Sequence, residues 1–252
     1  DDLNRLTKAE NTPNPAGGYT TYNYTYDSIG NMTYKSDLGF MTYGSGATPI
    51  VILSPDELGA KDLQGQTPSM PHAVTKAGSN AYTYDTNGNM LSAPNKLMTY
   101  DVENRLIKLE TSTQTTLFTY DADGSRIKKQ TGSATTAYIS SLFEKDSSGE
   151  TRKHIFAGST RIASITTNAV IPAQAGIHYY HGDHLGSSNI ITNSTGAQVQ
   201  HCEYTPYGTF ARNELSNGQI TQATNRYFTG KELDSTGLYF YAWRYYDPTI
   251  GR

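Results

Sequence analysis

Two aspartates near the end of the sequence have the residue type and spacing that acid catalysis would need. Asp234 and Asp247 are separated by a turn and by the strand-like text GLYFYAWRYY. Aspartic chemistry requires two neighbouring carboxyl groups, one protonated and one ionised, and a hairpin or inward spiral would bring these two together. Alternatively, Asp234 tightens the turn DSTG and Asp247 caps the turn DPTIG, where Pro248 presets φ. We favour this structural role of the two aspartates over catalysis by this chain. Charged residues able to shift a carboxylate pKa, or to act as ordinary cross-strand partners, lie nearby: Arg226, Lys231, Glu232 and Arg244.

A second group, in the text HYYHGDHLGSS, consists of possible metal ligands. It contains His181, Asp183 and His184. On a strand the first two share a face and His184 points away, so joint chelation would need a turn at Gly182. We favour a structural role for the three over a metal site, and we expect no cofactor.

The composition indicates a β-protein with polar, partly solvent-exposed sheet surfaces. Hydrophobic residues make up 36% and charged residues 17%, and there are 20 tyrosines against 7 phenylalanines, which suits a pleated, half-exposed surface. A net charge of −3 without a basic block gives no support for nucleic-acid binding. Cys202 is the single cysteine, so no internal disulfide forms. No apolar run approaches the roughly 20 residues that span a bilayer, and we expect no signal peptide within these residues.

Internal repetition is the strongest pattern in the sequence. The phrase YTYDSIGNM at residues 24–32 returns as YTYDTNGNM at 82–90, and the opening DDLNRLTKAE resembles DVENRLIKLE at 101–110. A Tyr-Asp pair also occurs at residues 246–247. The tyrosine, aspartate and glycine positions of the repeats are expected to be structural residues of ladders and turns: Tyr26, Asp27, Gly30, Tyr84, Asp85, Gly88, Tyr100, Asp101, Tyr120, Asp121 and Gly124.

Each copy predicts a β-hairpin. Tyr22, Tyr24 and Tyr26 alternate with small polar residues, which places their rings on one face of a strand. The aspartate after the tyrosine is suited to accept hydrogen bonds from turn amides. Asn87-Gly88 and Asp123-Gly124 predict two-residue turns with positive φ.

Hairpins of this kind are marginal alone and expose unpaired edges. We therefore expect them to pair side by side into one continuous, curved and spiralling sheet, and we expect the 252 residues to belong to a longer polypeptide. The Gly/Pro-rich residues 44–72 are predicted to be an insertion loop or lid, with a short helix near residues 54–65 as one option. The asparagines at 23, 31 and 193 match the glycosylation pattern.

The sequence resembles the RHS/YD-repeat proteins. The Tyr-Asp phrases carry the first half of the resemblance. HGDHLGSSNIITNSTGAQVQHCEYTPYGTF and RYFTGKELDSTGLYFYAWRYYDPTIGR, within residues 179–252, carry the second half and resemble the RHS-repeat-associated core domain. The resemblance implies an all-β shell segment at residues 1–170 and an inward-curling core domain, or plug, at 171–252.

Members of this family wind a strand–turn–strand ribbon into a hollow shell, in toxin-complex C subunits, Rhs toxins and teneurins. The resemblance implies a structural role in enclosing or presenting a polymorphic C-terminal toxin domain, in a secreted or cell-surface system. The partners would be the remainder of the polypeptide, neighbouring shell segments and the toxin cargo. Two alternatives stay open. One is a module that binds glycan or a cell-surface partner through its tyrosine faces. The other is part of an aspartate-dependent self-cleaving core that uses Asp234 and Asp247.

Overall fold

The structure is a computed structural model that describes residues 1–10, 20–44, 70–167, 176–216 and 223–252. It contains β-strands and one 3-10 turn, and no α-helix occurs in these ranges, which confirms the predicted all-β class. Most of the predicted insertion at 44–72, including the optional helix, lies outside the described residues, as does the predicted domain boundary at 170–171. The chain divides into two compact units, residues 1–98 and 99–252.

The first unit is a series of short antiparallel strands in chain order. Six of them form one sheet: β1 (Lys8–Glu10), β2 (Thr21–Tyr26), β3 (Met32–Lys35), β4 (Gly39–Tyr43), β5 (Val74–Ala77) and β6 (Asn80–Ala81). They are followed by β7 (Thr83–Tyr84), β8 (Met90–Ala93) and β9 (Lys96–Tyr100), which also pair in sequence order. In β2, Tyr24 is buried while its neighbours Asn23 and Thr25 are exposed, which confirms the predicted alternation.

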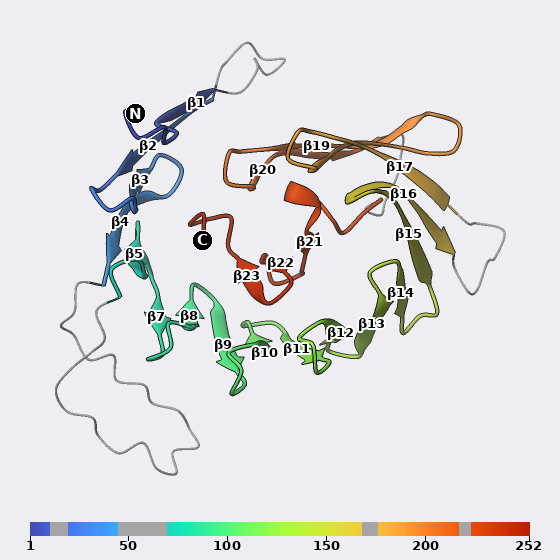
Figure 1. Cartoon of the computed structure of the whole chain (residues 1–252), viewed down its shortest axis with the longest axis horizontal. Helices are drawn as coiled ribbons and strands as arrows, with labels where there is room; N and C mark the ends of the chain where they lie inside the picture. Colours follow the sequence, from blue (N-terminus) through green and yellow to red (C-terminus); the bar gives the residue numbers. More distant parts are fainter. Residues whose placement is uncertain (11–19, 45–69, 168–175, 217–222) are drawn as a thin grey trace. The chain divides into compact units, whose positions relative to one another are not determined.

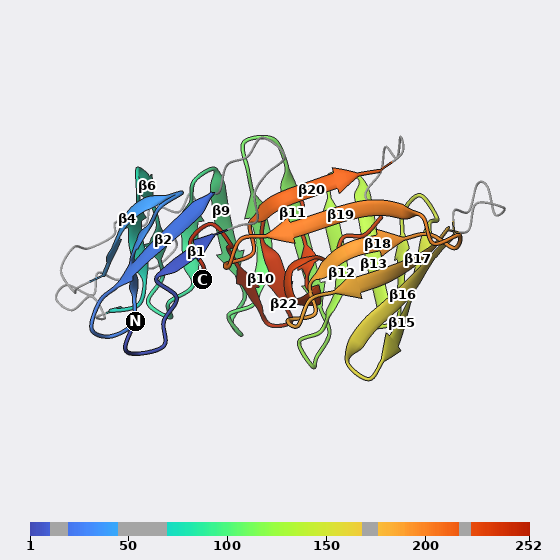
Figure 2. The same cartoon turned by 90° about the horizontal axis from the view of Figure 1, so that it is seen from above.

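The second unit holds eleven further strands that pair antiparallel, each with the next along the chain. They are β10 (Leu106–Glu110), β11 (Thr115–Tyr120), β12 (Arg126–Thr131), β13 (Ala134–Ser140), β14 (Phe143–Asp146), β15 (Thr151–Ala157), β16 (Thr160–Thr167), β17 (Gly176–Gly182), β18 (Ser188–Thr192), β19 (Gln198–Tyr204) and β20 (Phe210–Leu215). Figure 2 shows these strands side by side. The predicted pairing of successive hairpins is therefore confirmed within this unit.

The last residues of the second unit leave this sheet and fold against it. They form the 3-10 turn η2 (Phe228–Gly230) and a small sheet of β21 (Glu232–Leu233), β22 (Tyr239–Tyr241) and β23 (Arg244–Tyr246). Figure 1 shows the small sheet inside the curve of β10–β20. An aromatic core joins the two parts, in which buried Tyr227, Phe228 and Tyr239 pack with Cys202 of β19. We call residues 223–252 the C-terminal segment.

The repeated aspartates build the turns between strands. Asp85 accepts the amide N–H of Asn87 and of Asn89 on one carboxylate oxygen, at 2.9 and 2.8 Å. Its own N–H donates to the Asn89 carbonyl, and the Gly88 N–H donates to the Asp85 carbonyl. The same carboxylate-to-amide pattern occurs at Asp27, Asp101, Asp121, Asp146 and Asp183.

These turns correct the predicted two-residue loops. Gly88 has φ of 86° and Gly124 has φ of 79°, but Asn87 and Asp123 are absent from the residues with positive φ. A two-residue loop of the predicted type needs positive φ at both positions. The aspartate instead holds amides two and four residues ahead, which favours a longer loop followed by a bulge. The register shift next to Tyr84 agrees with that bulge.

An arginine ties one repeat to the next. The Nε of Arg105 donates to Asp101 at 2.7 Å and its Nη1 donates to the carbonyl of Asp121 at 3.2 Å. The same guanidinium lies 5.4 Å from the ring centroid of Tyr120, whose hydroxyl donates to the Leu106 carbonyl at 2.7 Å. The tyrosine and aspartate of one repeat are thus fixed on the turn of the repeat before it.

The first residues of the chain make the same set of contacts. Arg5 donates to Asp1 and to the carbonyl of Asp27, both at 2.7 Å. It lies 4.9 Å from the Tyr26 ring centroid, and Tyr26 donates to the Leu6 carbonyl at 2.8 Å. The opening phrase therefore folds as a further copy of the repeat, as its similarity to residues 101–110 predicts.

Candidate functional site

Asp234 lies at the contact between the C-terminal segment and the sheet. It follows β21, two residues after Glu232, and both carboxylates meet the same two cations of β12. Arg126 contacts Glu232 at 2.8 Å and Asp234 at 2.7 Å, and Lys129 contacts them at 2.5 and 2.6 Å. The side chains of Arg126, Glu232 and Asp234 are at most 1% exposed. Two carboxylates and two cations form a closed, charge-balanced cluster.

Aromatic side chains enclose the buried guanidinium. The Arg126 guanidinium carbon lies 4.0 Å from the Phe240 ring centroid and 4.7 Å from that of Tyr138. Arg126 also donates to the Tyr138 and Tyr245 hydroxyls at 2.9 and 3.1 Å. Tyr138 in turn donates to Glu232 at 2.7 Å. Aromatic stacking, together with hydrogen bonds and ion pairs to both terminal nitrogens, stabilises this guanidinium away from water, although its buried Nε has no partner among the described residues.

The two carboxylates have opposite pKa shifts. Burial disfavours the charge of Glu232, but Arg126 and Lys129 overcome that effect and lower its pKa to about 2. Burial raises the pKa of Asp234, and the Glu232 charge adds to the rise against the pull of Arg126 and Lys129. Neighbouring carboxyl groups with separated pKa values are the arrangement that acid chemistry uses, and they titrate as a pair.

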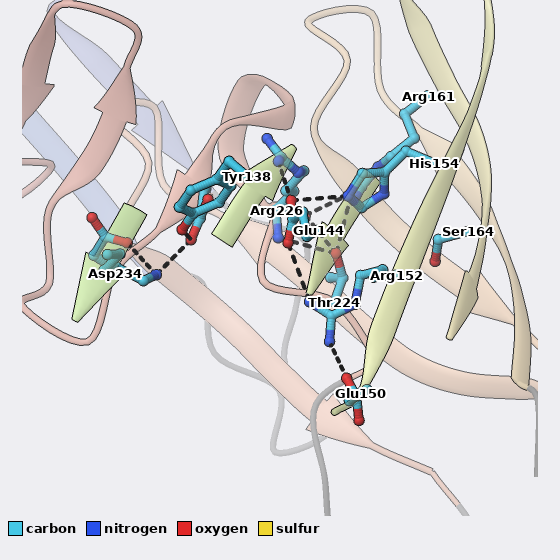
Figure 3. A network of polar contacts seen from close by, with 12 residues as sticks. Tyr138, Glu144, Glu150, Arg152, His154, Arg161, Ser164, Thr224, Arg226 and Asp234 are labelled. Carbon is cyan, nitrogen blue, oxygen red and sulfur yellow. Dashed lines mark hydrogen bonds and ion pairs between the residues drawn. The ribbon is translucent and has the colours of Figure 1, made fainter. Parts of the chain in front are cut away.

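A second polar cluster continues from the first and is centred on Glu144 of β14 (Figure 3). Glu144 is buried and contacts the Nε2 of His154 at 3.0 Å. It also pairs with Arg226 of the C-terminal segment, and Arg152 lies 3.9 Å away. Burial opposes the charge of Glu144, but His154 and Arg226 lower its pKa well below the ordinary range. Glu144 therefore holds the start of the C-terminal segment.

His154 should make the stability of the fold depend on pH. Burial, with Arg226 and Arg161 nearby, lowers its pKa below 6.5 against the influence of Glu144. The folded protein therefore binds a proton on His154 more weakly than the unfolded chain does. The stability that neutral His154 contributes is present above pH 6.5 and is lost as the pH falls below it.

We expect the free energy of unfolding of the wild type to fall more steeply than that of His154→Gln between about pH 7.5 and 5.5. Urea unfolding at a series of pH values measures both. The variant is the control because it keeps Asp234. The raised pKa of Asp234 adds stability at low pH that is lost as the pH rises, which is the opposite of the His154 effect. Parallel curves for the two proteins would refute the assignment.

Asp247 has a different environment from Asp234. Its carboxylate accepts the Thr249 N–H at 2.8 Å, and its carbonyl accepts the Gly251 N–H at 2.9 Å. This agrees with the turn-capping interpretation. No hydrogen bond joins the side chains of Asp234 and Asp247 in the part of the chain that the structure describes. Asp234 closes its own turn through its backbone while its carboxylate faces Arg126 and Lys129, so Glu232 is its neighbouring acid.

The structure adds residues that the sequence patterns did not single out. Arg126 and Lys129 stand in the ordinary strand text SRIKKQ, and more than 100 positions separate each of them from Asp234. Glu144 and His154 likewise lie in separate strands. Of the predicted neighbours, Glu232 adjoins Asp234, whereas Arg226 pairs with Glu144. No short-range spacing marks such contacts, since the docking of the C-terminal segment on the sheet creates them.

The histidine group is arranged as a turn. Asp183 accepts the N–H groups of Leu185 and Ser187 at 2.8 and 2.9 Å, and His181 contacts the Thr192 hydroxyl at 3.1 Å. Across the described ranges, no group of three or more His, Cys, Asp or Glu side chains is placed to hold a metal ion, and His184 joins none.

The three glycosylation motifs differ in access. Asn31 is buried, and its amide nitrogen donates to Asp27 and to the Pro71 carbonyl, so its motif is closed in the fold. The Asn193 side chain accepts two turn amides. Asn23 is exposed on β2.

Comparison with known families gives one match that covers most of the chain. The teneurin YD-shell family matches residues 72–252. Toxin subunit YenC1 of Yersinia entomophaga is 38% identical over 77 residues, which are 30% of this chain and 8% of that protein. The tRNA3(Ser)-specific nuclease WapA of Bacillus spizizenii is 25% identical over 242 residues, 92% of this chain and 9% of that protein. The chain thus spans less than a tenth of the length of these relatives.

A solved structure has the same fold. The Photorhabdus luminescens Tc holotoxin pore, with a TccC3 mutation, superposes with a TM-score of 0.64 at 19% identity, over 94% of this chain and 12% of that one. A crystal structure of TcdB2-TccC3 gives a TM-score of 0.55 at 19% identity, over 98% of this chain and 16% of that one.

Proposed function

This chain belongs to the teneurin YD-shell family, and from that premise we propose that it forms part of the wall of a larger shell that encloses a polymorphic C-terminal domain. The remainder of a longer polypeptide and neighbouring shell segments would pair with its sheets. A toxin domain would be the cargo, by analogy with the toxin subunits to which the chain is similar. Residues 1–170 would serve as wall and residues 171–252 as core domain.

One observation supports this proposal most directly. The C-terminal segment leaves the sheet and is held inside its curve by a buried, charge-balanced cluster around Arg126 (Figure 1). A segment secured in this way directs whatever follows it to the inner side of the sheet. The repeated Asp–Arg–Tyr contacts supply the complementary feature, a wall whose successive strands are fastened to one another.

The location that suits this role is extracellular or at the cell surface. The family and the toxin-subunit relatives support that location. Within the described ranges, no helix has the length and apolar character needed to cross a membrane.

Protease protection tests the proposal. The complete gene product that contains this chain is digested with trypsin, and the survival of any domain after Arg252 is followed by mass spectrometry. We expect that domain to resist digestion in the native protein and to be digested quickly once isolated. Equal rates in the two forms would contradict enclosure. A gene product that instead ends in a surface anchor would favour the glycan- or surface-binding alternative.

A second candidate function, carboxylate-dependent self-cleavage, is favoured by the burial of two neighbouring carboxylates, Glu232 and Asp234, against the same two cations. Asp234 would be the acid of the pair, and Asp247 remains a candidate from the sequence. Cleavage after Arg252 in the complete gene product, compared between Asp234→Asn, Asp247→Asn and Glu232→Gln, tests which carboxylate is required. Cleavage that persists in all three variants would exclude this function.

A further inference from the structure

Arg161 of β16 is a shielded guanidinium that lacks a carboxylate partner. Its Nη2 donates to the hydroxyls of Ser188 and Thr224, at 3.3 and 3.1 Å, and to the Arg226 carbonyl at 3.2 Å. Its guanidinium carbon lies 3.9 Å from the Tyr180 ring centroid. Among the described residues, no Asp or Glu oxygen lies within ion-pair distance of it. A guanidinium withdrawn from water normally requires a counter-ion.

Several polar atoms around Arg161 are shielded from solvent and make no hydrogen bond. They are its own Nη1, the Nε of Arg152, the Nε of Arg226 and the Nδ1 of His154. A buried donor left without a partner destabilises the fold, because it has lost its hydrogen bonds to water. The three arginine atoms are donors. If the Nε2–H of neutral His154 donates to Glu144, its Nδ1 is an acceptor.

The charges of this cluster do not balance. Arg152, Arg161 and Arg226 are matched by Glu144 and by Glu150, which lies 2.9 Å from Arg152. The Arg126 cluster, in contrast, sets two cations against two carboxylates. Burial, with Arg226 and Arg152 alongside, lowers the pKa of Arg161 to about 10, so it remains charged at neutral pH. One negative charge is missing from the Glu144 side of the network.

We propose that Arg152, Arg161 and Arg226 form, together with His154, a binding site for a small oxyanion that carries a proton, such as hydrogen phosphate. Guanidinium groups match the geometry of phosphate oxygens and make charge-assisted hydrogen bonds to them. The proton of the ligand would donate to the Nδ1 of His154. The side chains of Arg152 and Arg226 are 22% exposed, and an anion enters by displacing them.

An anion at this position would fasten the C-terminal segment to the sheet. Thr224 and Arg226 belong to that segment, whereas Arg152, His154 and Arg161 come from β15 and β16 (Figure 3). Because the site exists only when the two parts are docked, a bound anion stabilises the docked state by RT ln(1 + c/Kd), which grows with the anion concentration c. This consequence does not depend on what the shell encloses.

Titration with inorganic phosphate tests the site. At pH 7 and constant ionic strength, adjusted with sodium chloride, we expect the melting temperature to rise with phosphate and calorimetry to show one saturable site. Arg161→Gln should weaken binding by roughly tenfold or more. Arg105→Gln is the matched control, because it removes an arginine that is already paired with Asp101 and Glu103, and it should leave phosphate binding unchanged.

A parallel titration with acetate distinguishes a carboxylate ligand from a protonated oxyanion. Saturable binding of acetate with none of phosphate would overturn the assignment to a protonated oxyanion, as would a response to neither anion or an equal response in Arg161→Gln. If Arg161→Gln does not fold, calorimetry on Arg152→Gln replaces it, since this side chain is partly exposed. Undiminished phosphate affinity in that variant would then refute the site.

Discussion

Replacing Arg126 with methionine is expected to destabilise residues 99–252 by about 3–5 kcal/mol, the usual cost of removing one partner from a buried ion pair. The cost is large because the Arg126 side chain is almost completely buried. Without the guanidinium, Glu232 and Asp234 remain enclosed with Lys129 as their single cation. The C-terminal segment should detach from the sheet before the strands themselves unfold, because the cluster joins those two parts.

Urea unfolding and limited proteolysis measure the two consequences. Arg105→Met is the matched control: it also removes an arginine from a carboxylate, but that pair is about a fifth exposed and is expected to contribute much less because water screens it. Adding Asp234→Asn to Arg126→Met should recover part of the loss, since it removes one of the unpaired charges. Equal destabilisation by the two arginine substitutions would show that the cluster does not hold the segment.

Gly208→Ala is expected to cost about 2–4 kcal/mol, from strain in the backbone and overpacking of the aromatic core. Gly208 has φ of +88°, and a Cβ placed on it would lie 2.5 Å from the Cδ1 of Phe228. The Phe228 ring has little room to move, because the rings of Tyr204, Tyr239 and Tyr246 lie against it.

Gly196→Ala separates the two causes. Gly196 has φ of +82° in the same unit, but a Cβ there meets no atom within 4 Å, so only the backbone term of about 1 kcal/mol should appear. Thermal and urea unfolding of both variants give the difference. Phe228→Leu in the Gly208→Ala background should relieve part of the overpacking. Equal losses of stability in the two alanine variants would show that the contact between Gly208 and the Phe228 ring does not limit the size of the residue at position 208.

Together these substitutions examine the two attachments of the C-terminal segment, one polar and one aromatic. The polar attachment is expected to be the one sensitive to pH, because it contains His154, Glu144 and the coupled carboxylates. The aromatic attachment should be insensitive to pH near neutrality, since burial raises the pKa of Tyr227 to about 12. Release of the segment by acid, without loss of the aromatic core, would therefore involve the polar cluster.

Much of the local structure could be predicted from the sequence. The alternation of Tyr24 with exposed neighbours, the hairpins at the Tyr-Asp phrases and the turn role of Asp85 and Asp121 all depend on residues within about four positions of one another. Such short-range interactions form again in each copy of the Tyr-Asp phrase. The pairing of successive hairpins followed from their exposed edges, and the family resemblance added the inward C-terminal segment, which short-range patterns do not contain.

The turn type shows where local prediction failed. Asn87-Gly88 is the expected pair for a two-residue loop, yet only the glycine adopts positive φ. The carboxylate of Asp85 accepts two amides from across the turn, and those hydrogen bonds outweigh the preference of the dipeptide. The prediction treated the aspartate and the dipeptide as separate signals, whereas the structure couples them.

The sequence by itself determined the class of fold, the spacing of the hairpins and the aspartates of the turns, because these follow from side-chain periodicity and short-range hydrogen bonds. Only the tertiary structure decided the partners of Asp234. Arg126 and Lys129 reach it because the C-terminal segment docks on β12, and Glu144, His154 and Arg161 meet Arg226 for the same reason. Buried charges are matched by whichever groups the docked surfaces bring together, and no spacing along the chain encodes that choice.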